Sequence, residues 1–78
     1  MREVVLYTRT GCSLCATARA VLLAVRDELP FALREIDIDS DADLYEEHRY
    51  DIPVVEIDGR RAFKHRVDAA ALRKRLLS

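Results

Sequence analysis

The sequence lacks a long hydrophobic run, and its charges are nearly balanced. Half of its 78 residues are hydrophobic, but 35% are charged and interrupt the apolar stretches. A membrane-spanning helix needs about 20 consecutive apolar residues, so none is predicted. The first apolar-rich run, Val4–Thr8, is also shorter than the roughly 7 to 15 apolar residues of a signal peptide. We therefore expect a cytoplasmic protein.

The formal net charge is only -1, which gives no basic surface for nucleic acid or for an anionic membrane. The charges are nevertheless unevenly placed. Acidic residues dominate from Glu35 to Asp51, and a basic segment follows Gly59. That segment consists of Arg60, Arg61, Lys64, His65 and Arg66. It is compatible with a solvated turn or with attraction of an anionic thiol.

The first half of the chain shows a strand, a helix and a second strand. Val4–Thr8 is β-branched and aromatic and runs toward Gly11, which is typical of a buried strand. From Cys12 to Pro30 the apolar residues recur with the period of a helix. They are Leu14, Ala18, Val21, Leu22, Val25 and Leu29. Phe31–Ile38 has the pattern of a central strand that is covered on both faces.

In the second half, Ser40 followed by Asp43 indicates a capping box for a short helix that continues to Arg49. Ile52–Ile57 reads as a strand that leads into Asp58-Gly59, a strong hairpin signal, and Ala62-Phe63 can pair back. Asp68 is a suitable N-cap for a last helix, Ala69–Leu77, with Val67 and Leu72 as a hydrophobic staple. The predicted order is β-α-β-α-β-β-α in one domain, residues 1–78, with the first two strands parallel.

Only two cysteines are present, Cys12 and Cys15. They are too close in sequence to stabilise a fold, because the loop that they would close constrains almost no unfolded-chain entropy. They lie where a strand turns into a helix, and the free amides there lower the pKa of the first thiol below about 8.5. Arg9 is near enough in sequence to add to this effect. We expect Cys12 to attack a substrate disulfide and Cys15 to resolve the mixed disulfide.

The remaining candidates have simpler interpretations. His48 and His65 lack the short spacing of zinc-finger ligands, so no metal site is predicted. We assign His48 to a helix C-terminus and His65 to a turn or strand end. Pro53 can begin a strand because it has no amide hydrogen to donate. A more specific interpretation makes it a cis proline beside the dithiol, with the backbone of Ile52 free to pair with a substrate main chain.

Taken together, Tyr7–Cys15, Ile52-Pro53-Val54 and Asp58-Gly59 resemble the glutaredoxin-like family in order and spacing over nearly the whole chain. The resemblance implies an α/β, thioredoxin-like (glutaredoxin) fold with a four-stranded mixed sheet. It also implies that Cys12 is the nucleophile, that Cys15 is the resolving thiol and that Pro53 is a cis proline beside them. Arg9 matches the basic residue that helps to hold the glutathione carboxylate in glutaredoxins.

Four segments depart from the family pattern. Ser13-Leu14 stands in place of proline and tyrosine, and Asp51-Ile52-Pro53 replaces the usual threonine-valine-proline. Phe63-Lys64 stands near the position of paired glycines, where bulky side chains hinder close approach of a glutathione backbone. Asp68 matches the acidic residue for the γ-glutamyl amine only after a one-residue shift, and N-capping explains it equally well.

The sequence therefore predicts a monomeric thiol–disulfide oxidoreductase that reduces protein or low-molecular-weight disulfides without a bound cofactor. The electron donor stays open among glutathione, another low-molecular-weight thiol and thioredoxin reductase, the last as in mini-thioredoxins that serve ribonucleotide reductase. Two alternatives belong to other classes. One is a non-catalytic thioredoxin-fold module that binds a partner or a metal. The other is an iron–sulfur carrier that uses Cys12 and an external thiol in a dimer.

Overall fold

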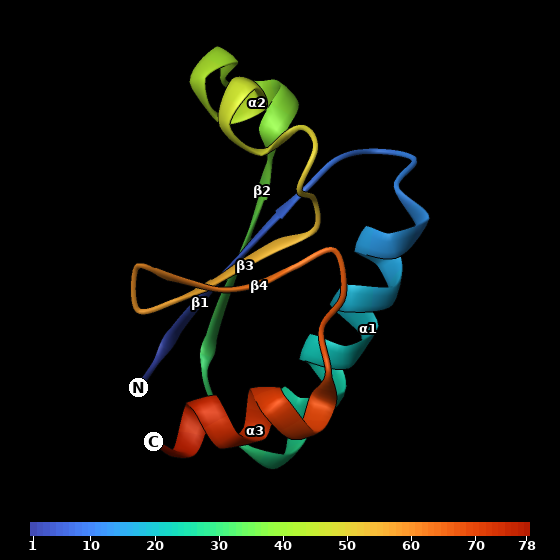
Figure 1. The fold of residues 1–78 in the computed structure, drawn as a ribbon. Coiled ribbons are helices and arrows are strands. Elements are labelled where there is room, and N and C mark those ends of the chain that lie inside the picture. The colour runs from blue at the N-terminus through green and yellow to red at the C-terminus, as the bar shows by residue number, and fades with distance from the viewer.

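The computed structural model describes residues 1–78 and confirms the predicted order of helices and strands (Figure 1). The elements are β1 (Glu3–Thr8), α1 (Ser13–Glu28), β2 (Ala32–Asp37), the 3-10 helix η1 (Ile38–Ser40), α2 (Ala42–His48), β3 (Val54–Ile57), β4 (Arg60–Lys64) and α3 (Ala69–Leu77). The short helix η1 is an addition to the predicted order. No helix combines the length and the apolar character that a membrane crossing needs.

The four strands form one mixed sheet in the order β2-β1-β3-β4. β1 and β2 are parallel, as predicted, and β3 is antiparallel to both of its neighbours. β1, β2 and β4 therefore run in one direction and β3 in the other. As a result, the segments that follow β1, β2 and β4 lie at the same end of the sheet as the segment that precedes β3. This shared end, which we call the upper end after Figure 1, holds the candidate site.

One face of the sheet packs against α1 and α3. Alternate residues of a strand point to opposite faces, so Val4 and Leu6 of β1 lie on this face together with Val55 and Ile57 of β3. The helices contribute buried side chains to the same cluster, namely Ala18, Leu22, Val25 and Leu72. Burial of one such leucine stabilises the fold by about 2 kcal/mol. This core fixes α1, and with it the start of the helix, against the sheet.

The opposite face is covered at its upper end by α2. Tyr7 of β1 points to this face, and its ring stacks on the ring of His48 in α2. Val54, which pairs with Tyr7 across β1 and β3, is fully buried beside them. In Figure 1, α2 sits above the sheet, away from α3. The sheet is thus sandwiched at its upper end.

The prediction of a central strand at Phe31–Ile38 is wrong. β2 has β1 as its one neighbour and forms an edge of the sheet, with most of its residues exposed. The apolar residues that suggested full burial flank the strand. Phe31 packs into the core just before β2, and Ile38 is buried in η1 just after it. The sequence pattern of a central strand therefore arose from buried residues that flank an edge strand.

The predicted helix start at Ser40 is also wrong. Ser40 ends η1, where its hydroxyl donates to the Asp37 carbonyl at 2.6 Å. α2 begins after Asp41, whose carboxylate accepts from the N–H groups of Asp43 at 2.8 Å and Leu44 at 3.3 Å. Aspartate and serine are comparable N-caps, so the pattern could not decide between adjacent positions.

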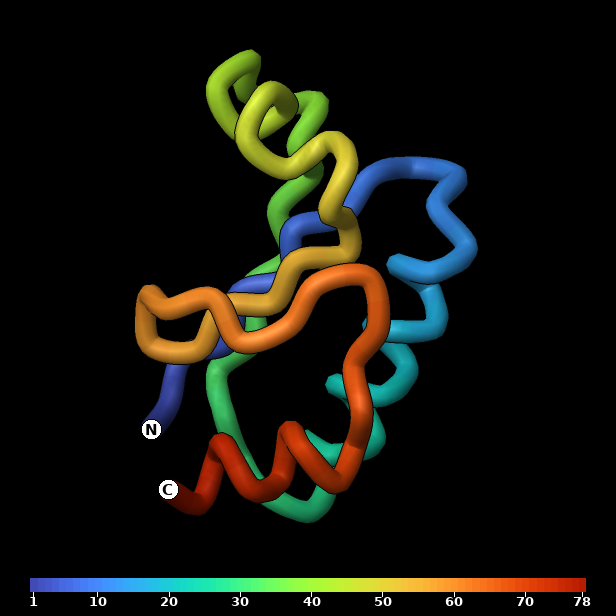
Figure 2. The backbone as a smooth tube through the Cα atoms, in the orientation of Figure 1, coloured from blue at the N-terminus to red at the C-terminus, as the bar shows by residue number.

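The predicted hairpin and last helix are confirmed. Asp58 (φ 52°) and Gly59 (φ 82°) both have left-handed backbones, as a two-residue hairpin turn of this twist requires. Asp68 caps α3 by accepting from the Ala71 N–H at 2.8 Å. Arg2 bonds to the Ser78 main-chain carbonyl, so the two ends of the chain meet at the lower end of the sheet (Figure 2).

Candidate active site

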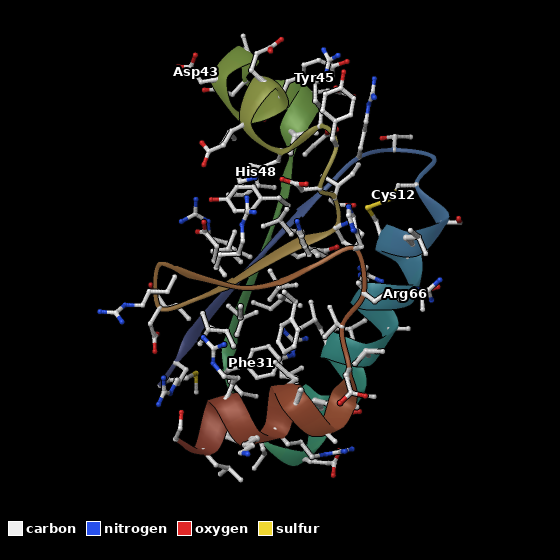
Figure 3. All side chains as sticks on the ribbon, viewed as in Figure 1. Cys12, Phe31, Asp43, Tyr45, His48 and Arg66 are labelled. Carbon is white, nitrogen blue, oxygen red and sulfur yellow. A yellow bond between two sulfur atoms is a disulfide. The ribbon has the colours of Figure 1, made fainter.

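Cys12 is the N-cap of α1 and lies at the upper end of the molecule (Figure 3). Its Sγ accepts a hydrogen bond from the Cys15 N–H at 3.1 Å. The two residues are joined by a disulfide, with their Cα atoms 5.2 Å apart. The first turn of α1 contains no acidic side chain that would oppose a negative charge on the sulfur. The helix start therefore offers Cys12 a main-chain donor and a favourable dipole.

The two sulfurs differ in access. Cys12 is half-buried, whereas Cys15 is only 3% exposed and belongs to the buried stripe of α1 with Ala18 and Leu22. Leu14, which we had placed on that stripe, is instead 38% exposed. The helix begins at Ser13, and the residues that face the core recur from Cys15 onward, so Leu14 points outward between the two cysteines. A reagent from solvent meets Cys12 first.

The segment before β3 contains the cis peptide bond Ile52–Pro53. The structure thus has the cis proline that the family resemblance implied. The Ile52 N–H donates to the His48 carbonyl at 3.2 Å, so the prediction that the Ile52 backbone is wholly free is wrong. The bend from α2 into β3 uses that N–H internally. The Ile52 carbonyl accepts no hydrogen bond within the chain.

Arg9, in the segment after β1, is paired with an acidic residue of the protein itself. Its Nε donates to Asp39 of η1 at 2.9 Å, and its guanidinium lies over the Tyr45 ring, 5.2 Å from the centroid. The hydrogen bond from Arg9 to Asp39, followed by the charge of Asp39, raises the pKa of Arg9 above its ordinary value. The Arg9 main-chain carbonyl accepts from the Cys12 N–H at 3.3 Å, but the Arg9 side chain forms no hydrogen bond with Cys12 or Cys15. The carboxylate of Asp39, which follows β2 at the same end of the sheet, competes for the guanidinium.

The segment after β4 is tied to the cis-proline segment. His65 has a left-handed backbone (φ 66°), and its N–H donates to the carbonyls of Pro53 at 2.8 Å and Asp51 at 3.2 Å. The His65 ring Nε2 lies 3.0 Å from the Tyr50 carbonyl oxygen. His65 is thus a strand-end residue, as predicted, and it fixes residues 64–66 beside residues 50–53.

His48 ends α2, as predicted, but it is buried, with only 2% of its surface exposed. Its ring lies against the Tyr7 ring of β1, and Nδ1 has no hydrogen-bond partner. Next to it, the Tyr7 hydroxyl donates to Glu56 at 3.3 Å, and burial, then the Glu56 carboxylate, raise the pKa of Tyr7. No group of three or more His, Cys, Asp or Glu side chains is arranged to hold a metal ion.

Sequence reasoning missed two exposed side chains at the upper end of the sheet. One is Leu14, and the other is Tyr50, which is 76% exposed and directly precedes the cis-proline segment. The guanidinium of Arg49 lies over the Tyr50 ring, 4.5 Å from its centroid. The sequence could have pointed to them only by their positions, because Leu14 lies within the Cys12–Cys15 motif and Tyr50 lies close to Ile52-Pro53.

Comparison with known proteins agrees with this geometry. A family model described as "Glutaredoxin-like domain (DUF836)" matches residues 3–77. A curated relative, the "Glutaredoxin-like protein YDR286C homolog" of Dictyostelium discoideum, is 40% identical over 68 residues. That match takes in 80% of this chain but only 63% of the relative, so the chain spans less than two thirds of its length.

Solved structures show the same fold. A structural-genomics target protein from X. campestris is 32% identical, with a TM-score of 0.79 over 94% of this chain and 93% of that one. A protein from Nitrosomonas europaea is 25% identical, with a TM-score of 0.82 over 95% and 89%. The oxidised mitochondrial thioredoxin 3 of Saccharomyces cerevisiae, 19% identical with a TM-score of 0.71 over 97% and 76%, shares the fold. The chain therefore belongs to the glutaredoxin-like (DUF836) family and has a thioredoxin-like fold.

Proposed function

We propose that the protein is a thiol–disulfide oxidoreductase that reduces protein or low-molecular-weight disulfides through Cys12 and Cys15. One observation carries this proposal: the Cys15 N–H points at the Cys12 Sγ from 3.1 Å at the start of a helix. A donor in that position stabilises the thiolate, which is the attacking species in disulfide exchange. Cys12 is also the more accessible of the two, since it is half-buried whereas Cys15 is buried.

The reaction takes two exchange steps. The Cys12 thiolate attacks one sulfur of the substrate disulfide, a mixed disulfide forms, and the first substrate thiolate leaves and takes a proton from water. Cys15, deprotonated in turn, attacks the Cys12 sulfur and releases the second substrate thiol. The substrate disulfide is reduced to two thiols, and the protein dithiol is oxidised to the disulfide seen here. The Ile52 carbonyl would accept a main-chain N–H of the substrate, with Pro53 packing beside the sulfurs.

The electron donor that restores the dithiol is glutathione, another low-molecular-weight thiol or thioredoxin reductase. Two features bear on glutathione. The side chain of Phe63 packs against the core, so it does not project over the dithiol, whereas Lys64 is exposed at the strand end. Arg9, the expected partner of the glutathione carboxylate, uses its Nε for Asp39, and its two Nη atoms form no hydrogen bond within the chain. A glutathione carboxylate would therefore share this guanidinium with Asp39.

We further propose that the protein acts as a monomer in the cytoplasm and has no resident cofactor. A reducing compartment suits a dithiol that must be regenerated. Arg9, Ile52 and Pro53 stay candidate substrate-binding residues. An iron–sulfur carrier or a non-catalytic binding module would share the fold, and the experiment below separates these functions.

The test is equilibration of the protein in glutathione redox buffers, followed by alkylation of free thiols and intact mass. As the redox potential of the buffer rises, we expect a reversible transition from a form with two alkylated cysteines to a form with none. We also expect a transient glutathione adduct on Cys12. Parallel reactions replace glutathione with thioredoxin reductase and NADPH. Cycling in the second reaction alone would identify the mini-thioredoxin type of donor.

Three other results would contradict the proposal. If the thiols never form a disulfide and react no faster than a free cysteine, the protein is a binding module. If the double Cys12→Ser/Cys15→Ser variant keeps a partner that the wild type binds, the cysteines are not needed for that binding. If freshly purified protein absorbs visible light and loses the colour in Cys12→Ser, it carries an iron–sulfur cluster.

A further inference from the structure

Large apolar side chains are exposed at very few places in this protein. They are Met1, Leu14, Tyr50 and Leu77. Met1 and Leu77 belong to the two ends of the chain. Leu14 lies between the two cysteines, and Tyr50 lies two residues before Ile52, in the segment that precedes β3 at the same upper end of the sheet. Exposed aromatic and aliphatic residues of this kind are typical anchors in protein interfaces.

Two basic side chains of the segment that follows β4 are also unpartnered. Lys64 ends β4 and Arg66 follows it, and neither forms an ion pair or a side-chain hydrogen bond. The neighbouring Arg61 is different, because it lies 3.6 Å from Asp51. The backbone hydrogen bonds of His65 hold Lys64 and Arg66 next to the cis-proline segment. Figure 3 shows Arg66 between β4 and α3, below Cys12.

The acidic side chains on the other flank are mostly engaged within the protein. Asp39 pairs with Arg9, and Glu46 lies 3.8 Å from Arg49. Asp37 and Asp41 accept hydrogen bonds from backbone N–H groups. On the side of the β4–α3 segment, Lys64 and Arg66 give a local positive charge that no ion pair neutralises, although the whole chain has a net charge of -1. This local charge complements an acidic partner.

The surface around the dithiol has no cavity. The cavity that the structure contains, of about 60 Å³, lies between β1 and β2 against Glu3, Val5 and Leu33, at the lower end of the sheet. Small molecules bind preferentially in concave sites that enclose most of their surface. An open surface with exposed apolar anchors and free cations suits a segment of another protein.

We propose that this surface binds an acidic, extended segment of a disulfide-bearing protein. Tyr50 and Leu14 contact apolar side chains of the segment, and Lys64 and Arg66 contact its carboxylates, which brings the substrate disulfide to Cys12. This inference rests on the proposed function and narrows its substrate class from disulfides in general to acidic protein disulfides.

The experiment measures how fast the reduced protein, freed of reductant, reduces synthetic disulfides. Two probes are disulfide-linked dimers of short peptides with a cysteine beside a leucine, one flanked by glutamates and one by lysines. The third probe is oxidised glutathione. Each rate is divided by the rate of the same probe with dithiothreitol, so the intrinsic reactivity of the probe cancels. We expect the normalised rate for the acidic peptide to be roughly tenfold higher than for the basic one, and the ratio to shrink as salt is added.

Matched variants identify the residues responsible. Lys64→Glu/Arg66→Glu should abolish the preference for the acidic peptide, and Lys64→Gln/Arg66→Gln should leave an intermediate one. The control, Arg60→Glu/Lys74→Glu, changes the charge by the same amount at exposed positions away from the upper end and should keep the preference.

A second set of variants tests the apolar anchors. Tyr50→Ser and Leu14→Ser should slow the reduction of both peptides, whereas Leu77→Ser, which removes an exposed leucine at the end of the chain, should not. Slower reduction in Leu77→Ser as well would contradict the assignment of the anchors.

The inference is overturned if the two peptides are reduced at equal normalised rates, or if the preference survives in Lys64→Glu/Arg66→Glu. It is also overturned if oxidised glutathione is the fastest probe, because the site would then serve a small anionic disulfide. In these cases the proposed oxidoreductase function stands. If no probe is reduced, the proposed function fails and the inference fails with it.

Discussion

The imidazole ring of His48 stacks on the phenol ring of Tyr7, with centroids 4.3 Å apart and an interplanar angle of 26°. The His48 carbonyl accepts from the N–H groups of Asp51 and Ile52. This residue therefore joins β1, α2 and the cis-proline segment at one point. The ring is buried and its Nδ1 has no hydrogen-bond partner, which is unfavourable for a polar atom. The other ring nitrogen, Nε2, lies 3.7 Å from the Glu47 carboxylate. We expect most of the stability that the ring contributes to come from packing.

The first prediction concerns this packing. His48→Ala removes the stacked ring and leaves a cavity, so it should lower the free energy of unfolding by about 2–4 kcal/mol. His48→Phe keeps a ring on Tyr7 and removes the unpartnered nitrogen, so it should change stability by less than about 1.5 kcal/mol. Urea unfolding followed by circular dichroism measures both. A Phe variant as unstable as the Ala variant would show that the imidazole polarity matters.

Much of the fold could be predicted from local patterns. The apolar period from Cys12 to Pro30 and the Asp58-Gly59 pair each determine an element within a few residues. The position of a strand in the sheet is not local. Phe31–Ile38 looked central because Phe31 and Ile38 are buried, yet β2 is an edge strand whose neighbours along the chain fill the core and η1. The order of strands in a sheet depends on which faces the helices cover. The residues of one strand do not contain that information.

The second prediction tests the start of α2. Asp41→Ala removes the acceptor for the N–H groups of Asp43 and Leu44 and should lower the free energy of unfolding by about 1 kcal/mol. Ser40→Ala is the matched control, because its hydroxyl bonds only to the Asp37 carbonyl in η1, and it should have a smaller effect. A larger loss of unfolding free energy in Ser40→Ala than in Asp41→Ala would show that Ser40 is the N-cap of α2.

The candidate site was predictable where its chemistry lies in short motifs. Cys12, Cys15 and the cis Pro53 occupy the places that the sequence indicated. The environment of Arg9 was not predictable, because its partner Asp39 follows a different strand and meets it only when β1 and β2 pair in parallel. Exposure of Leu14 likewise depends on a shift of the buried face by one residue at the helix start.

The third prediction assigns the two cysteines. Cys12→Ser should abolish reduction of a disulfide, because the exposed, N–H-bonded sulfur is lost. Cys15→Ser should keep the attack and accumulate a mixed disulfide with the substrate, since the resolving thiol is missing. After incubation with oxidised glutathione, intact mass should show one glutathione adduct on Cys15→Ser and none on Cys12→Ser. An adduct on Cys12→Ser and none on Cys15→Ser would reverse the roles.

The fourth prediction follows from Asp58, which closes the hairpin onto the start of β1. Its carboxylate accepts from the Glu3 N–H at 3.0 Å and pairs with Arg2 at 3.0 Å. The Glu3 hydrogen bond, then Arg2, lower the pKa of Asp58 below its ordinary value. A carboxyl group with a lower pKa in the folded state stabilises the fold above its unfolded pKa of about 3.9. That stabilisation is lost as the pH falls through the lower, folded value.

Asp58→Asn should therefore be less stable than the wild type at neutral pH, and the difference should narrow as the pH falls below about 4. Asparagine tolerates the left-handed backbone at this position, so the change tests the charge rather than the turn. Thermal unfolding across a pH series measures the difference, with Asp27→Asn, whose carboxylate forms no ion pair, as the control. A difference that is constant across the series would show that Asp58 acts through the turn alone, because a hydrogen bond that both amide and carboxylate can accept does not depend on pH.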